Sequence, residues 1–331
     1  MPSKSRFFPV ASLLFAFSPL WAGPVFPNLK VVPWNGHKAA TSLTFDDGDP
    51  SHLDVVVPEL DRRHLHGTFF LIANHIERKD DWRKILASGH GIGNHTLDHK
   101  HANELTPGDE ESQVSGALHV LQKEFGVTVY TFAYPFCEIS PGLRNWVEKT
   151  HLLARGGGGR GTKFEITPDE EPDWLNIPAR ATMTDLPLST YQKWIKTDYK
   201  KGGWLVWMIH GLEGTKSGWQ PISQKNFEGI LDDLQSKDIW VGTFLEVGSY
   251  FRAEKIFEKA VIQKSDNEET WKWNLPDHFP DRVFLKVRLS AVGPEGVEVW
   301  QGGQRLSQNE RGMYLIDFSL KGLTLSYPPK N

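Results

Sequence analysis

The sequence predicts an α/β protein, a barrel of βα units followed by a small all-β appendage. From residue 39 to about residue 250, short runs typical of strands alternate with amphipathic runs typical of helices. This alternation indicates parallel βα units. About seven repeats within about 215 residues suit a closed or nearly closed barrel, with an open doubly wound sheet as the alternative. Beyond about Arg252, strand-like runs follow one another without helices between them.

The elements of the barrel can be assigned in order along the chain. The strand-like runs are rich in β-branched and aromatic residues and cover residues 39–45, 67–72, 89–95, 128–135, 151–156, 204–211 and 239–247. The helical runs cover residues 51–65, 80–89, 108–126, 141–150, 189–202 and 222–238. The helix over 108–126 has acidic residues in its first turn and Gly126 at its end, which are typical helix boundaries. The GGGG run at 156–159 lacks the Lys-Ser/Thr of a phosphate-binding loop.

The first residues have the pattern of a secretory signal peptide. Basic residues precede an apolar run from Phe7 to Leu20, and small residues follow. A membrane span needs about 20 apolar residues, and this run is shorter and interrupted by two prolines. We therefore expect cleavage near Ala22 or Gly23, a secreted or periplasmic protein, and no membrane anchor.

These observations divide the chain into a signal peptide (1–22), a barrel domain (23–253) and a β appendage (254–331). The strand-like runs of the appendage are residues 281–291, 296–306 and 313–327. We expect the appendage to pack on the barrel, and a carbohydrate-binding module is the alternative.

Composition narrows the range of partners. The net charge is −4 and 24% of the residues are charged, which gives no basic footprint for nucleic acid or an anionic membrane. The 13 Trp residues suit both a core and a sugar-stacking surface. Cys137 is the single cysteine, so an internal disulfide is excluded, and we expect Cys137 to be a packed thiol.

Functional groups of a parallel βα barrel collect at the carboxyl ends of its strands. Four informative segments fall at such ends. They are residues 44–48 (TFDDG), 94–99 (NHTLDH), 132–137 (FAYPFC) and 208–211 (MIHG).

His95 and His99 have i, i+4 spacing, so on one helical turn both imidazoles would point the same way. Two imidazoles that hold a divalent cation need an anionic ligand as well, and Asp47 can supply it. The neighbouring Asp46 would then lie beside the cation and accept a proton from the attacking water. The His spacing alone is weak evidence for a metal site, because chance often produces it among 13 His. The paired Asp residues and the two His residues together are a much stronger indication.

These segments resemble the motifs of the NodB-type polysaccharide deacetylases, carbohydrate esterase family 4. The resemblance covers about residues 39–250, with TFDDG, His-Thr-x-x-His about fifty residues later, a strand that ends in Pro-aromatic, and Ile-His at a later strand end. It implies a distorted (β/α)7 barrel and a metal-dependent removal of acetyl groups from amino sugars or, in some members, from xylan.

Carried over by position, the resemblance makes Asp46 the general base. It makes Asp47, His95 and His99 the ligands of a divalent cation, with Zn²⁺ as the first choice. His210 would be the general acid that protonates the leaving group.

Further positions follow from the same resemblance. Phe136, after Pro135, matches an aromatic position whose backbone N–H helps to hold the tetrahedral oxyanion. Trp219 lies in the loop after the Ile-His strand end, where it could stack on a sugar ring.

The sequence also departs from the family pattern. The third motif of the family often carries an Arg that steadies the base, and Ala133 stands there. Arg155 and Arg180 are the candidates to support Asp46, with Arg180 slightly favoured. Cys137 stands where Gly is common.

The predicted function is therefore a secreted metal-dependent hydrolase that removes N-acetyl or O-acetyl groups from an acetylated glycan. Two alternatives remain open at this point. One is an amide or cyclic-imide hydrolase on the same fold, because fold alone does not fix the substrate. The other is a non-catalytic glycan-binding protein.

Overall fold

The computed structural model describes residues 29–159, 161–214, 218–290 and 296–328. The expected signal peptide, residues 1–22, lies outside the described residues. Among the described residues, no helix has the length and apolar character needed to cross a membrane.

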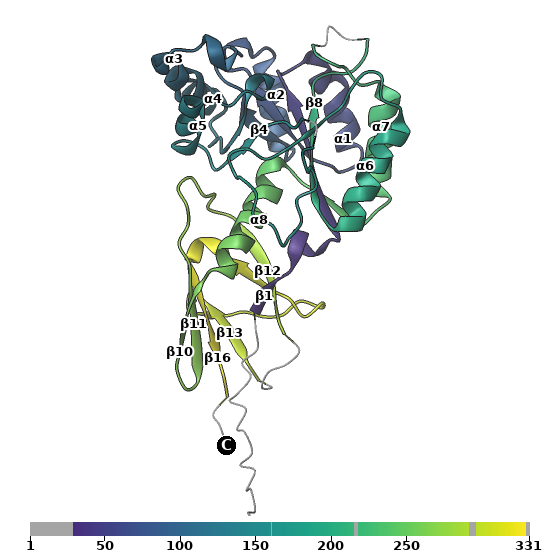
Figure 1. Ribbon diagram of the computed structural model, residues 1–331. Helices are drawn as coiled ribbons and strands as arrows, with labels where there is room; N and C mark the ends of the chain where they lie inside the picture. Colours follow the sequence, from purple (N-terminus) through teal and green to yellow (C-terminus); the bar gives the residue numbers. More distant parts are fainter. Residues whose placement is uncertain (1–28, 160, 215–217, 291–295, 329–331) are drawn as a thin grey trace, which may run out of the picture.

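A curled parallel sheet forms the centre of the larger part of the molecule (Figure 1). The strands follow the order β6-β5-β4-β3-β2-β8-β7. They are β2 (Ala39–Asp46), β3 (Gly67–Leu71), β4 (Gly91–Asn94), β5 (Thr131–Ala133), β6 (Leu153–Arg155), β7 (Arg180–Ala181) and β8 (Trp204–Ile209). Every residue of β2, β3 and β8 is buried, because parallel strands are covered on both faces.

The two ends of this sheet approach each other. Ile177 forms a parallel bridge with Arg155 of β6, and Arg180 of β7 pairs with Trp207 of β8. The segment from residue 177 to residue 181 therefore joins the outer strands, and the sheet curls into the distorted (β/α)7 barrel that the sequence predicts.

Helices cover the outside of the barrel, with α3, α4 and α5 on one side and α6 and α7 on the other (Figure 1). Their bounds are α1 (Val57–Asp61), α2 (Lys79–Ala87), α3 (Pro107–Glu111), α4 (Ala117–Phe125), α5 (Pro141–Glu148), α6 (Leu188–Lys201) and α7 (Gln224–Gln235). One-turn π-helical segments lead into α1 and α4, so the expected helices over 51–65 and 108–126 are each built from more than one piece.

The expected strand over 239–247 is wrong in its second half. Strand β9 (Ile239–Val241) pairs with β2, and only two residues separate its end from helix α8 (Phe244–Glu258). The Thr243 hydroxyl accepts a hydrogen bond from the Glu246 N–H, and the Glu246 carboxylate accepts one from the Thr243 N–H. This capping box starts a helix and outweighs the β-propensity of Phe-Leu-Glu-Val.

Helix α8 belongs to two hydrophobic cores. Phe244, Val247 and Phe251 pack among buried barrel residues, whereas Tyr250 and Phe257 pack in the core of the appendage. A helix that is apolar on opposite sides is buried on both. The expected boundary between residues 253 and 254 consequently lies inside α8.

The appendage is a sandwich of two antiparallel sheets. One sheet contains β1 (Leu29–Val31), β12 (Phe284–Leu289) and β15 (Tyr314–Asp317). The other has the order β10 (Val261–Lys264), β11 (Glu268–Lys272), β16 (Gly322–Ser326), β13 (Glu298–Gln301) and β14 (Gln304–Arg305). Strand β1 precedes the barrel in the chain but pairs with β12, so residues 29–31 belong to the sandwich.

Candidate active site

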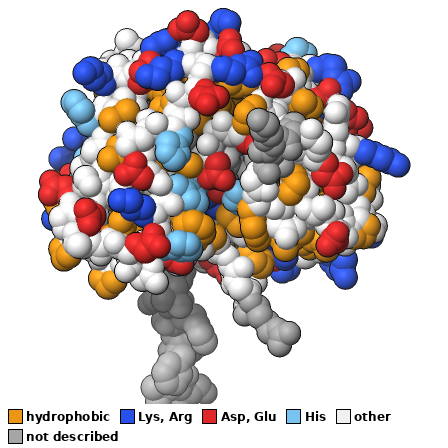
Figure 2. Space-filling view, turned by 90° about the horizontal axis from the view of Figure 1, so that it is seen from above, with side chains coloured by type: hydrophobic (Ala, Val, Ile, Leu, Met, Phe, Trp, Pro, Cys, Tyr) orange, Lys and Arg blue, Asp and Glu red, His pale blue; other side chains and the backbone are white. Residues whose placement is uncertain are grey.

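The carboxyl ends of the barrel strands bring the expected catalytic segments to one end of the molecule. β2 ends at Asp46, β4 at Asn94 and β8 at Ile209, and Phe45 pairs directly with Ile209. Seen from the end of the barrel opposite the sandwich, several His side chains surround an acidic side chain near the centre of the face (Figure 2).

Asp47, His95 and His99 converge on one point. The Nε2 atoms of His95 and His99 each lie 3.4 Å from Asp47 Oδ1. One potential ligand atom from each of the three residues lies within 4.8 Å of the others. Two imidazole nitrogens and a carboxylate oxygen at this spacing are a typical donor set for a catalytic Zn²⁺ that keeps a fourth position open.

The two histidines do not share a helical turn, which corrects the expectation from their i, i+4 spacing. Residues 95–99 form an irregular loop. The Thr96 N–H donates to Asn94 Oδ1 over 2.9 Å, and the His99 N–H donates to Thr96 Oγ1 over 3.0 Å. These side-chain hydrogen bonds compete with helical ones and bring the two rings together.

Left-handed backbone conformations are concentrated at this site. The φ angles are 71° at Asp47, 67° at Thr96, 56° at His99 and 59° at Cys137. Such conformations are costly for non-glycine residues and persist where the surroundings enforce them, often at functional sites. The value at Cys137 also explains why Gly is common at the matching family position, since Gly adopts this conformation without a steric cost.

The orientation of His95 is fixed from behind. Its Nδ1 lies 2.8 Å from the carbonyl oxygen of Ala133, an acceptor that holds the proton on Nδ1 and leaves Nε2 to face the site. A carbonyl behind a His is the usual support for a metal ligand. Ala133 thus supports His95 through its backbone carbonyl group.

The electrostatics of the cluster favour ionised Asp47. Burial raises the pKa of Asp47, but the close contact with His95 and the electrostatic influence of the His210 and His99 imidazoles outweigh burial and hold this pKa below its usual range. Burial and the charge of His95 lower the pKa of His99 to about 4. A carboxylate beside a neutral imidazole is the protonation state that binds a cation.

Asp46 is paired with Arg155, and not with Arg180 as slightly favoured from the sequence. Arg155 Nη2 donates to Asp46 Oδ2, and both side chains are buried. Arg180 lies instead 3.0 Å from Glu165 and over the rings of Phe164 and Trp194. Among the described residues, Asp46 Oδ1 is buried without a hydrogen-bond partner, so this oxygen is free to accept a proton.

His210 also lies close to Asp46. Its Nε2 is 3.9 Å from Asp46 Oδ2, and its carbonyl oxygen is hydrogen-bonded to His52 Nε2. Burial lowers the pKa of His210, although the charges of Asp46 and Asp47 act in the opposite direction. The imidazole is therefore neutral at pH 7. The rings of His210 and Trp219 are in an edge-to-face arrangement, with a centroid distance of 5.1 Å.

A pocket of about 310 Å³ contains these groups. It is lined by Asp46, Asp47, His95, His99, Tyr134, Phe136, Cys137, Met208, His210 and Trp219. Phe136 and Trp219 are each 50% exposed, so they form apolar walls at the mouth of the pocket. Cys137 is half-buried with its sulfur 3.8 Å from Met208 Sδ, and burial raises the pKa of its thiol.

No motif in the sequence assigns a role to His101, which the structure brings to the edge of the site. Its ring stacks on Phe136 at a centroid distance of 3.6 Å, and its Nδ1 lies 3.0 Å from Glu138 Oε1. The signal available was its position two residues after His99, which is weak evidence in a chain with 13 His.

Residues 35–154 match the family model of polysaccharide deacetylases. The chain is 24% identical over 290 residues to a gellan lyase from a Bacillus species, an alignment that covers 79% of this chain and 11% of that protein. It is 28% identical over 123 residues to a peptidoglycan-N-acetylglucosamine deacetylase from Bacillus cereus, which covers 37% of this chain and 44% of that protein. The chain thus spans less than half the length of these two relatives.

A solved structure of a candidate polysaccharide deacetylase from Mycobacterium smegmatis has a similar fold. The TM-score is 0.55 with 16% identity, over 68% of this chain and 94% of that one. At this identity the likeness concerns the fold alone.

Proposed function

Because residues 35–154 match the family model of polysaccharide deacetylases, we propose that this chain is a metal-dependent hydrolase that removes N-acetyl or O-acetyl groups from a polysaccharide or oligosaccharide. The observation that carries the proposal is the arrangement of four side chains. Asp47, His95 and His99 form a compact ligand set, and Asp46 lies beside it with one buried oxygen unpaired among the described residues.

The ligand set fits a divalent cation by its chemistry. Asp47 Oδ1 is buried and has no hydrogen-bond partner among the described residues, a costly state for a carboxylate oxygen unless a positive charge compensates it. Asp47, His95 and His99 would hold the cation, and Zn²⁺ suits two imidazoles and one carboxylate. The cation would supply a Lewis acid that polarises the acetyl carbonyl and the attacking water.

Asp46 would remove the proton from the attacking water. The Arg155 guanidinium binds Oδ2 and leaves Oδ1 to receive the proton, so the base is held in one orientation. General bases of this kind contribute a factor of about 10² to 10⁴ in rate. The same ion pair compensates the charge of Asp46 in a buried site.

His210 would return a proton to the leaving nitrogen or oxygen. Because burial lowers its pKa, the imidazole starts neutral and needs a proton during the reaction. The Asp46 carboxyl lies beside His210, with Oδ2 3.9 Å from Nε2, so the proton taken up at Oδ1 would be held next to the imidazole that has to donate one. The Phe136 N–H would hold the developing oxyanion, as the family resemblance implies.

The mouth of the pocket suits a sugar. Phe136 and Trp219 both line it and both remain half-exposed, and exposed aromatic faces beside polar groups are suited to the C–H faces of a pyranose. A second hollow of about 300 Å³ continues past Asp47 and His210 and is lined by His75, Glu77 and Trp82, among others. The site is therefore open enough to admit one residue of a longer chain.

Acetate release tests the proposal. The purified protein is incubated with chitin oligosaccharides, peptidoglycan, poly-N-acetylglucosamine and acetylated xylan, with and without a chelator. Release from at least one glycan that the chelator abolishes, and that Asp46→Asn abolishes too, is the expected result. Release that is indifferent to the chelator contradicts the mechanism, and release from a small cyclic imide alone favours the imide hydrolase.

We also propose that the protein acts outside the cytoplasm, with residues 1–22 removed as a signal peptide. The apolar run from Phe7 to Leu20 and the small residues after it support this. N-terminal sequencing of the mature protein from culture medium or periplasm should find a start at or near Gly23, and an intact Met1 in an exported sample would contradict it.

A further inference from the structure

The outer face of the five-stranded sheet is organised in rows of paired residues. Gln263, Thr270, Thr324, Trp300 and Arg305 lie directly opposite one another on the neighbouring strands β10, β11, β16, β13 and β14. Paired residues share a face of a sheet, and the residues that alternate with them, such as Trp271 and Leu325, fill the sandwich core. This row therefore points away from the core along its whole length.

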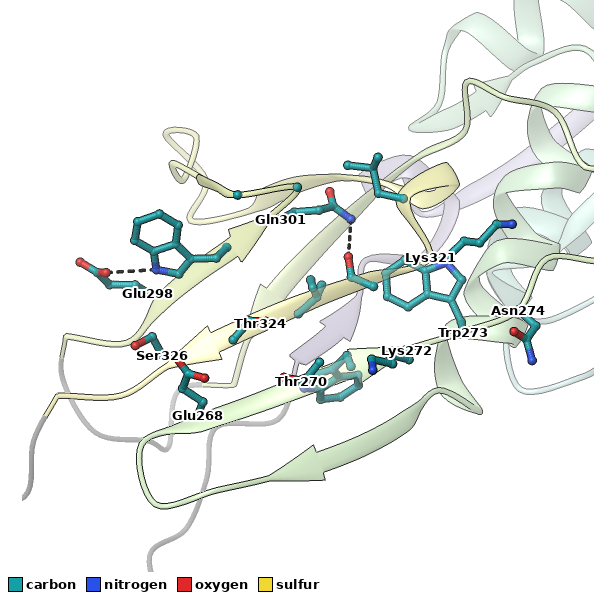
Figure 3. Close-up of a pocket in the computed structure, with 17 residues that line it drawn as sticks. Glu268, Thr270, Lys272, Trp273, Asn274, Glu298, Gln301, Lys321, Thr324 and Ser326 are labelled. Atoms are coloured by element: carbon teal, nitrogen blue, oxygen red, sulfur yellow. Dashed lines mark hydrogen bonds between the residues drawn. The ribbon is translucent and has the colours of Figure 1, made fainter.

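A second row runs parallel to the first. Glu268, Ser326 and Glu298 pair across β11, β16 and β13, and Figure 3 shows their side chains on the same side of the sheet as Thr270 and Thr324. Together the rows present hydroxyl, carboxylate and cationic groups around one indole.

Trp300, on the fourth strand of this sheet, is held in place by a hydrogen bond. Its Nε1 donates to Glu298 Oε2 over 3.2 Å, and Glu298 also pairs with Arg305 over 3.1 Å. The side chain is 36% exposed, so a large apolar ring faces solvent on the side of the sheet that contributes nothing to the core. An exposed aromatic that is fixed by a hydrogen bond is preorganised for a ligand.

The surface beside Trp300 is hollowed, with a volume of about 810 Å³. Glycines line part of it: Gly302 and Gly303 form the turn between β13 and β14, and Gly322 begins β16. Leu320, which is 52% exposed, supplies a second apolar contact at the edge. The hollow thus has apolar contacts at two places and polar groups between them.

From these observations we propose that this face binds a strand of the same glycan that the barrel deacetylates, which rests on the proposed function. Trp300 would stack on the C–H face of one pyranose, and the Thr, Glu, Lys and Arg side chains would bind hydroxyl groups of its neighbours. The hollow contains Lys272 and Lys321 as well as Glu268 and Glu298. Charges of both signs suit a hydroxyl-rich ligand and do not suit a polyanion such as nucleic acid.

The position of this face determines how a bound glycan would affect the enzyme. The sandwich lies at the end of the molecule opposite the histidine-rich face (Figures 1 and 2), and α8 joins it to the barrel through the cores of both parts. A glycan on the sandwich would therefore hold the enzyme on a polymer without taking part in the reaction.

The test compares retention on polymers with turnover of a short substrate. The full chain is sedimented with insoluble chitin, peptidoglycan sacculi and insoluble xylan. Trp300→Ala is expected to lower the affinity for the retained polymer roughly fivefold, while acetate release from a soluble short oligosaccharide stays unchanged. Leu315→Ala, which removes a more exposed apolar side chain (53%) from β15 in the other sheet, is the control and should bind like the wild type.

Each outcome has a defined meaning. Trp300→Ala that binds like the wild type overturns the inference, and so does a wild-type chain retained by none of the three polymers. Asp46→Asn separates the two proposals, because it should abolish acetate release and keep full retention. Retention that depends on Trp300, together with no acetate release from any glycan, would contradict the proposed function but support the glycan-binding face.

Discussion

Arg155 and Asp46 form a buried ion pair across the interior of the barrel, with Nη2 of the guanidinium 2.5 Å from Oδ2 of the carboxylate. The two residues end β6 and β2, which are not neighbours in the sheet. The pair provides the support for the proposed base, Asp46, that Ala133 cannot supply through its side chain. Because Arg155 binds Oδ2, the ion pair also leaves Oδ1 of Asp46 as the oxygen that can accept a proton.

Replacement of Arg155 should therefore affect both catalysis and stability. Arg155→Met leaves Asp46 buried without its partner, which costs about 3–5 kcal/mol, and we expect kcat to fall at least about 100-fold. The measurements are acetate release and thermal unfolding.

The matched control for this change is Arg180→Met. Arg180 pairs with Glu165 away from the pocket, so kcat should remain close to that of the wild type even if the melting temperature falls. Loss of activity in the Arg180 variant, with activity kept in the Arg155 variant, would reverse the assignment.

The local motifs were sufficient to predict where the site lies. TFDDG and NHTLDH lie at the ends of strands in a βα pattern, and such ends meet at one end of a barrel, so the sequence alone groups Asp46, Asp47, His95 and His99. The partner of Asp46 could not be predicted, because it lies 109 residues away and its identity depends on how the sheet curls. The sequence offers two arginines near strand ends, Arg155 and Arg180, and the slight preference for Arg180 is wrong.

Two errors of local structure have the same physical origin. The loop at 95–99 and the start of α8 are both decided by side-chain hydrogen bonds, in which the hydroxyls of Thr96 and Thr243 accept from backbone N–H groups. Periodicity and β-propensity average over several residues and do not register such bonds. The assignment of β1 to the sandwich depends on its pairing with β12, about 250 residues later, which no local pattern contains.

The capping box of α8 gives a stability prediction. Thr243→Ala removes the hydroxyl that accepts from the Glu246 N–H, and loss of an N-cap costs about 1 kcal/mol. We expect the melting temperature to fall by roughly 2 °C. Glu246→Gln keeps the capping box and should melt within about one degree of the wild type; an equal fall in both variants would show that the cap is not the cause.

Asp198 gives a prediction for the pH dependence of stability. Burial and the neighbouring Glu165 raise its pKa from 3.8 to about 8. The folded chain then binds more protons than the unfolded chain between about pH 4 and pH 8. The free energy of unfolding should fall as the pH rises through this window, with a slope of at most about 1.4 kcal/mol per pH unit from this group.

Asp198→Asn removes this titration. Its melting temperature should fall less than that of the wild type between pH 5 and pH 8, as scanning calorimetry can measure. Asp185→Asn, which changes an exposed carboxylate, is the control and should follow the wild type. A wild-type melting temperature that rises over this range in parallel with the Asp198 variant would contradict the prediction.

The central claim is that Asp47, with His95 and His99, binds one divalent cation while Asp46 stays unligated. Equilibrium dialysis of the full chain against Zn²⁺, with metal content read by mass spectrometry, tests it most directly. One cation per chain is expected in the wild type and in Asp46→Asn, and at least about 100-fold weaker binding in Asp47→Ala. A cation retained by Asp47→Ala and lost by Asp46→Asn would contradict the claim.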